Sequence, residues 1–77
     1  MQEVLIFTKP ECEKCKLAKE IGKKLEKMPD KYAVKYLSLA NPEGLMEFTY
    51  HNFQYPPAIM VGDKKYSIMK VAEKELL

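Results

Sequence analysis

The chain has 77 residues, 47% of them hydrophobic, and its 13 lysines against 11 acidic residues give a formal net charge of +2. A chain this short predicts one domain, residues 1–77, with a thin core, because such a domain buries only roughly 60% of its unfolded surface. Arginine is absent and the lysines alternate with glutamates, so a nucleic-acid partner is not expected. No apolar run approaches the length of a membrane span, so no membrane partner is expected either.

Residues 4–8 form a continuous apolar run of β-favouring side chains. This pattern predicts a central strand that is covered on both faces. Pro10 cannot donate to a strand ladder and should end it. The run is also too short for a signal peptide and no basic segment precedes it, so we expect a cytoplasmic protein, and a monomer.

A helix is predicted from about Cys12 to the residue before Pro29, since helical geometry is unfavourable immediately before a proline. Gly22 lies inside this pattern and costs about 1 kcal/mol relative to alanine, unless close packing requires it. The apolar face of the helix recurs at spacings of three and four residues: Ala18, Ile21, Leu25 and Met28.

The rest of the chain alternates between strand and helix signals. Residues 33–39 predict a second strand, and Asn41, Pro42 and Glu43 predict the start of a helix that includes Leu45 and Phe48 and ends near residue 52. Residues 58–61 and 65–69 predict an antiparallel hairpin, and residues 71–77 a short closing helix. The order β-α-β-α-β-β-α predicts an α/β fold, a four-stranded mixed sheet with helices on both faces.

Cys12 and Cys15 are the only cysteines, three residues apart at the predicted junction of a strand and a helix. A disulfide between them would close a very small loop and constrain the unfolded chain little, which favours chemistry over stapling. Disulfide exchange needs a thiolate, and a helix N-terminus stabilises negative charge there. We therefore expect Cys12 to attack a substrate disulfide and the deeper Cys15 to resolve the mixed disulfide.

Two thiolates at this spacing also suit metal chemistry. A copper(I) metallochaperone and a redoxin that bridges an iron–sulfur cluster between two chains remain alternatives. A structural zinc site needs four ligands, whereas this chain offers two cysteines and the distant His51, so no resident metal is predicted. A simple interaction module is a further alternative. Pro57, before an apolar strand, is either a cis turn or an ordinary strand boundary.

Residues 8–15, Thr-Lys-Pro-Glu-Cys-Glu-Lys-Cys, resemble the Lys-x-x-Cys-x-x-Cys segment of glutaredoxins and the Thr-Lys-Pro-x-Cys-x-x-Cys segment of the redoxins that serve ribonucleotide reductase. The chain as a whole resembles the glutaredoxin and thioredoxin superfamily, in its element order and in the proline before its third strand. The resemblance implies a thioredoxin-like fold and thiol-disulfide oxidoreductase activity. It assigns the nucleophile to Cys12, the resolving thiol to Cys15 and a thiolate-stabilising cation to Lys9.

The resemblance also makes Pro57 the cis-proline that lines the substrate groove, with Pro56 beside it. Pro56 has no N–H to donate, and the Gly-Gly turn and acidic pair that hold glutathione in glutaredoxins are missing. Glutathione is therefore not the expected partner. The expected partners are proteins with disulfides and an external reductase, similar to thioredoxin reductase, that reduces the pair without a bound cofactor.

Overall fold

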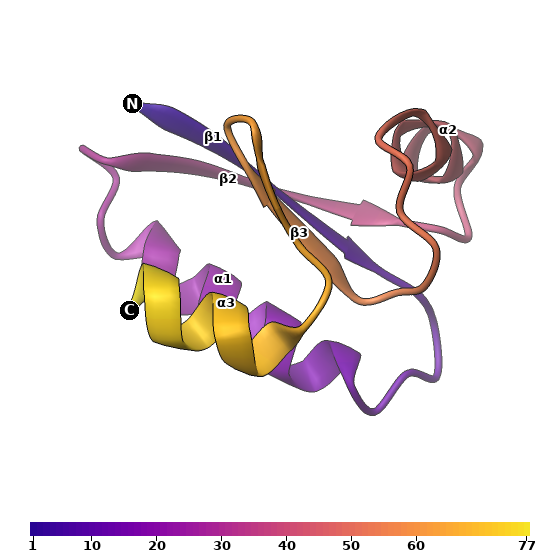
Figure 1. The fold of residues 1–77 in the computed structure, drawn as a ribbon, viewed down its shortest axis with the longest axis horizontal. Coiled ribbons are helices and arrows are strands. Elements are labelled where there is room, and N and C mark those ends of the chain that lie inside the picture. Colours follow the sequence, from indigo (N-terminus) through magenta and orange to yellow (C-terminus); the bar gives the residue numbers. More distant parts are fainter.

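The computed structural model describes residues 1–77 and contains four strands and three helices (Figure 1). In chain order the elements are β1 (Gln2–Thr8), α1 (Cys15–Glu26), β2 (Tyr32–Ser38), α2 (Pro42–Tyr50), β3 (Ala58–Val61), β4 (Lys64–Tyr66) and α3 (Met69–Leu76). The expected α/β class, with a four-stranded mixed sheet and helices on both faces, is confirmed. None of the helices combines the length and apolar character that crossing a bilayer requires.

The strands lie in the order β2-β1-β3-β4. β1 pairs in parallel with β2 from Gln2↔Tyr32 to Thr8↔Ser38, and in antiparallel fashion with β3. β3 in turn pairs antiparallel with β4. β1 is therefore a central strand, as its continuous apolar run predicts, and the parallel β1–α1–β2 unit is followed by an antiparallel hairpin.

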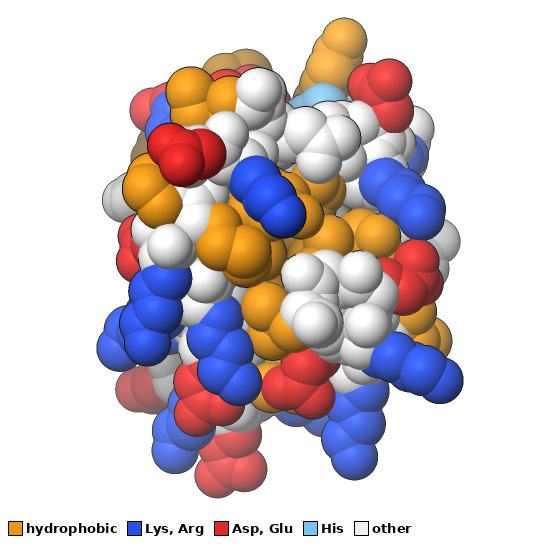
Figure 2. Space-filling view, turned by 90° about the vertical axis from the view of Figure 1, so that its left-hand side faces the viewer, with side chains coloured by type: hydrophobic (Ala, Val, Ile, Leu, Met, Phe, Trp, Pro, Cys, Tyr) orange, Lys and Arg blue, Asp and Glu red, His pale blue; other side chains and the backbone are white.

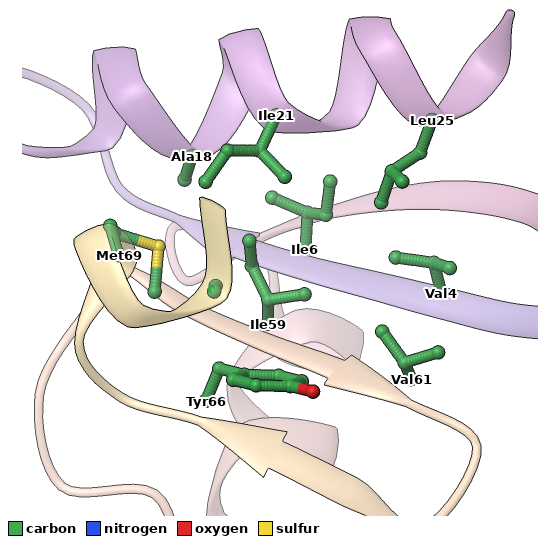
Figure 3. Close-up of a cluster of buried hydrophobic side chains, with 10 residues drawn as sticks. Val4, Ile6, Ala18, Ile21, Leu25, Ile59, Val61, Tyr66 and Met69 are labelled. Atoms are coloured by element: carbon green, nitrogen blue, oxygen red, sulfur yellow. The ribbon is translucent and has the colours of Figure 1, made fainter. Parts of the chain in front are cut away.

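The larger core fills the space between the sheet and the helices α1 and α3 (Figure 3). Val4 and Ile6 project from one face of β1 toward this layer, because alternate side chains of a strand point to the same side. Three of the four apolar positions predicted on α1 are buried, and Met28 is half-buried. The ten buried members are Val4, Ile6, Ala18, Ile21, Leu25, Ile59, Val61, Tyr66, Met69 and Ala72.

The opposite face of the sheet is covered by α2 and the segment after it. Phe7 projects from β1 to this side, and its ring centroid lies 5.6 Å from that of Phe48 and 5.4 Å from that of Phe53. Leu37 and Ala58 complete this smaller cluster. Packing among the rings of Phe7, Phe48 and Phe53 therefore joins α2 and the segment after it to the sheet.

The expected boundaries were wrong at the start of α1 and at the junction of the hairpin with α3. α1 begins at Cys15, because the chain first turns at the left-handed Glu11 and again at residues 13–16, where the N–H of Lys16 donates to the carbonyl of Glu13. The hairpin strand ends at Tyr66 and α3 begins at Met69, so residues 67–68 turn from the strand into the helix. Leu45 is 50% exposed, which leaves Phe48 as the main apolar contact of α2.

Candidate functional site

A six-residue connection between β1 and α1 carries the first cysteine. It leaves the sheet after Thr8, turns through the left-handed Glu11, and is drawn into a turn where the N–H of Lys16 donates to the carbonyl of Glu13 at 3.2 Å. Lys14 is the N-cap of α1 and provides no side-chain hydrogen bond to the helix. Cys12 thus lies just outside the helix, whereas Cys15 is its first residue.

Cys12 and Cys15 form a disulfide, with their Cα atoms 5.3 Å apart, inside the normal range for such a bond. The two residues differ sharply in exposure: Cys15 is only 1% exposed, and Cys12 is half-buried. The bond also holds the Cys12 sulfur beside the first turn of α1, whose backbone N–H groups favour negative charge. A nucleophile from outside therefore reaches this pair by way of Cys12.

The two prolines lie where the chain enters β3. Pro57 is buried directly before Ala58, and the peptide bond between Pro56 and Pro57 is cis. A groove of about 390 Å³ has Pro57 on one wall and Lys14, from between the two cysteines, on another. Pro56 and Pro57 also line an adjoining hollow of about 340 Å³, which again includes Lys14. The structure thus places both prolines at hollows shared with the Cys-x-x-Cys segment.

Lys9 lies directly after β1, is exposed, and makes no ion pair. The Cys12 sulfur is bonded to Cys15, and no side-chain hydrogen bond joins it to Lys9. His51 is the C-cap of α2, and its Nε2 lies 3.3 Å from Oε2 of Glu47. No three His, Cys, Asp or Glu side chains gather in a metal-binding arrangement.

Residues 67–70 contribute to the groove, although the sequence predicts a strand that reaches Met69 and leaves Lys70 unassigned. No capping residue signals the start of α3, because its N-cap is Ile68, whose side chain cannot accept a hydrogen bond. Tyr55, which is 78% exposed at the rim of the adjoining hollow, had no signal in the sequence either. Its position depends on the turn that follows α2, where Asn52 has a left-handed backbone with φ of 63°.

Figure 2 shows the end of the molecule that lies opposite the start of α1. This end holds both chain termini, and hydrophobic side chains form a central area there with lysines and acidic residues around it. The largest surface hollow, about 500 Å³, is lined by Gln2, Val61, Asp63, Lys64, Tyr66 and Leu76. It has no cysteine, and its lining mixes one acid with one lysine, so it carries no evident reactive centre.

Comparison with known proteins adds no assignment. No family model matches the chain, and no curated protein is significantly similar to it. The features that bear on function are therefore the disulfide, its position between β1 and α1, and the hollows that Lys14 lines.

Proposed function

We propose that this protein is a thioredoxin-like thiol-disulfide oxidoreductase. The observation that carries the proposal is the Cys12–Cys15 disulfide at the start of α1, in which Cys12 is half-buried and Cys15 is fully buried. A disulfide stabilises a fold more when it joins distant parts of the chain, because it then constrains the unfolded chain more. This disulfide spans a sequence separation of only 3. The mixed sheet and the entry of β3 beside the Cys-x-x-Cys segment support the thioredoxin-like assignment.

In the proposed reaction, the reduced protein begins with a Cys12 thiolate. This thiolate attacks one sulfur of a substrate disulfide, the other substrate sulfur leaves as a thiolate, and a mixed disulfide forms. The Cys15 thiolate then attacks the Cys12 sulfur and releases the second substrate thiolate. The dithiol has lost two electrons and two protons, the substrate has become two thiols, and the Cys12–Cys15 disulfide seen in the structure is the product.

Burial explains this division of roles. Cys15 is 1% exposed, so a protein substrate cannot reach it, but it lies within bonding reach of Cys12. Both cysteines lie at the uncapped N-terminus of α1, and we expect this position to lower the pKa of the reduced Cys12 below the value of about 8.5 for free cysteine. Lys9, which is exposed and unpaired, would add to this effect electrostatically.

The expected partners are cytoplasmic proteins with disulfides, together with an external reductase, similar to thioredoxin reductase, that returns electrons from NADPH to the Cys12–Cys15 pair. Pro56 has no backbone N–H to offer a small thiol compound, so glutathione is a poorer candidate for that donor. The proposal needs no bound cofactor, and the protein would act as a monomer.

The test is reduction of insulin disulfides by the full chain with NADPH and thioredoxin reductase as donor. We expect steady NADPH oxidation with the wild type and only the protein-free background with Cys12→Ser. Substituting glutathione and glutathione reductase for the donor should give a slower reaction. Equal rates for the wild type and Cys12→Ser would refute the proposal.

A further inference from the structure

The groove beside the disulfide lies between the first turns of α1 and α3, whose N-termini point to the same end of the molecule (Figure 1). Leu17 from α1 and the buried Met69 from α3 give it an apolar floor, with Pro57 beside them. Ile68 stands at its edge and is 64% exposed. Its volume of about 390 Å³ is sufficient for a few side chains of a partner.

All the charge on the groove lining is positive. Lys14 and Lys70 are its only charged residues, and neither forms an ion pair, although three such pairs occur elsewhere in the chain. Glu11 and Glu13 precede Lys14 in the connection but do not line the groove. In a chain with nearly balanced charge, two unpaired lysines around an apolar floor favour a partner that is both apolar and acidic.

The helix backbones add to the positive electrostatic potential that the two lysines create at the groove. The N-caps of α1 and α3, Lys14 and Ile68, make no side-chain hydrogen bond to their helices. Lys16 and Val71 donate their N–H groups to the backbone carbonyls of Glu13 and Ile68, and the positive ends of both helix dipoles lie at the groove. A carboxylate of a partner would be attracted by these dipoles and by the lysines.

The adjoining hollow extends the surface past the Cys-x-x-Cys segment. It shares Lys14, Pro57 and Ser67 with the groove and adds the exposed ring of Tyr55, and none of its lining residues is acidic. Because the two hollows share three residues, they form one continuous track. A track of this kind accommodates an extended chain segment better than a single side chain.

We propose that this track docks an extended segment of a partner protein in which acidic and apolar residues flank the cysteine to be reduced. This inference rests on the proposed oxidoreductase function and specifies its substrate class. Lys14 and Lys70 would pair with the acidic side chains, and Leu17, Ile68 and Tyr55 would contact the apolar ones.

The test uses three short peptides, Leu-Glu-Cys-Glu-Leu and its versions with Gln or Lys in place of both Glu, each as a mixed disulfide with mercaptoethanol. The reduced full chain should cleave the acidic peptide with a kcat/KM about fivefold above the Gln version, as expected for a few exposed charge pairs, and the Lys version should be slowest. High salt should reduce this preference, because it screens exposed charges.

Lys70→Gln should lower the ratio of acidic to neutral kcat/KM by about threefold, the effect of one exposed charge pair. Lys74→Gln is the matched control, since Lys74 is exposed on the same helix but lies outside the groove, and it should leave the ratio unchanged. Faster reduction of a glutathione mixed disulfide than of the acidic peptide would overturn the assigned occupant.

Equal rates for all three peptides would overturn the docking inference and leave the oxidoreductase proposal intact. Failure of every peptide, with the wild type equal to Cys12→Ser, would instead refute the oxidoreductase function. A binding measurement tests the docking inference separately from the oxidoreductase proposal. The acidic peptide with Ser in place of Cys should shift the backbone amide NMR signals of Leu17, Ile68 and Lys70 in the oxidised protein, and the absence of these shifts would contradict the docking site.

Discussion

The two faces of the sheet are built on different contacts. α1 passes over its face at Gly22, where a Cβ would collide with the side-chain ends of Ile6 and Tyr36. α2 meets the other face at Gly44, where a Cβ would collide with the backbone carbonyl of Ser38. A side-chain end can shift, whereas a strand carbonyl cannot. Side-chain movement can therefore accommodate part of the clash at Gly22, whereas a Cβ at Gly44 would push α2 away from the backbone of the sheet.

The two layers also differ in how many residues they contribute to the disulfide and the hollows. The face of α1 and α3 supplies Cys15, Lys14, Leu17 and Met69 to the disulfide and groove. The helix α2 itself contributes no residue to either hollow, although the segment after it brings Tyr55 and Pro56 to the second one. Substitutions on α2 should therefore change the stability of the protein, and those around the start of α1 should change its chemistry.

The largest expected effect is the loss of disulfide reductase activity in Cys12→Ser, down to the uncatalysed background, because the attacking thiolate is gone. Tyr50→Ser is the matched control on α2, where Tyr50 is 76% exposed. It should retain wild-type activity in the insulin assay and change the free energy of unfolding by less than about 0.5 kcal/mol. A comparable loss of activity in Tyr50→Ser would remove the distinction between the two faces.

Gly44→Ala should lower the free energy of unfolding by about 3 kcal/mol in urea titrations, because the new Cβ meets the Ser38 carbonyl and α2 must move away from β2. The gain in helix propensity, about 1 kcal/mol, is too small to offset this. A neutral or stabilising effect would mean that α2 lies farther from β2 than in the structure.

Reduction of the Cys12–Cys15 bond should lower the free energy of unfolding by at most about 2 kcal/mol, since it closes a loop of very few residues. Urea titrations with and without a reductant measure this difference. Cys12→Ser has no disulfide, so its free energy of unfolding should be the same in both titrations. A much larger loss would show that the bond is chiefly a structural staple.

Gly22→Ala should have the smallest effect, a loss of about 1 kcal/mol or less. The clash with the fully buried Ile6 opposes the gain in helix propensity, and the partly exposed Tyr36 ring can turn aside. Equal losses for Gly22→Ala and Gly44→Ala would contradict the contrast between side-chain and backbone contacts.

Much of this arrangement follows from the sequence. The apolar run of β1 predicts its central position, and the spacing of Ala18, Ile21 and Leu25 predicts the buried face of α1. The cysteine spacing predicts a pair that can bond, which the structure contains. These signals are local, because each depends on neighbours within a few turns of chain.

The parts that could not be predicted depend on backbone geometry or on distant contacts. Glutamate rarely adopts a positive φ, so nothing in the residue type of Glu11 indicated a left-handed turn directly before Cys12. The groove combines the start of α1, the entry to β3 and the turn into α3. Lys70 became a candidate for binding only after the fold brought it to the same hollow as Lys14.

The central claim is that Cys12 attacks and Cys15 resolves, and the most direct measurement is the trapping of the mixed disulfide. Reduced Cys15→Ser and Cys12→Ser proteins would each be mixed with a disulfide-bonded peptide, quenched with acid and digested for mass spectrometry. The account predicts a stable peptide adduct on Cys12 in Cys15→Ser, and almost none on the buried Cys15 in Cys12→Ser. Equal adducts on both cysteines, or an adduct only on Cys15, would contradict it.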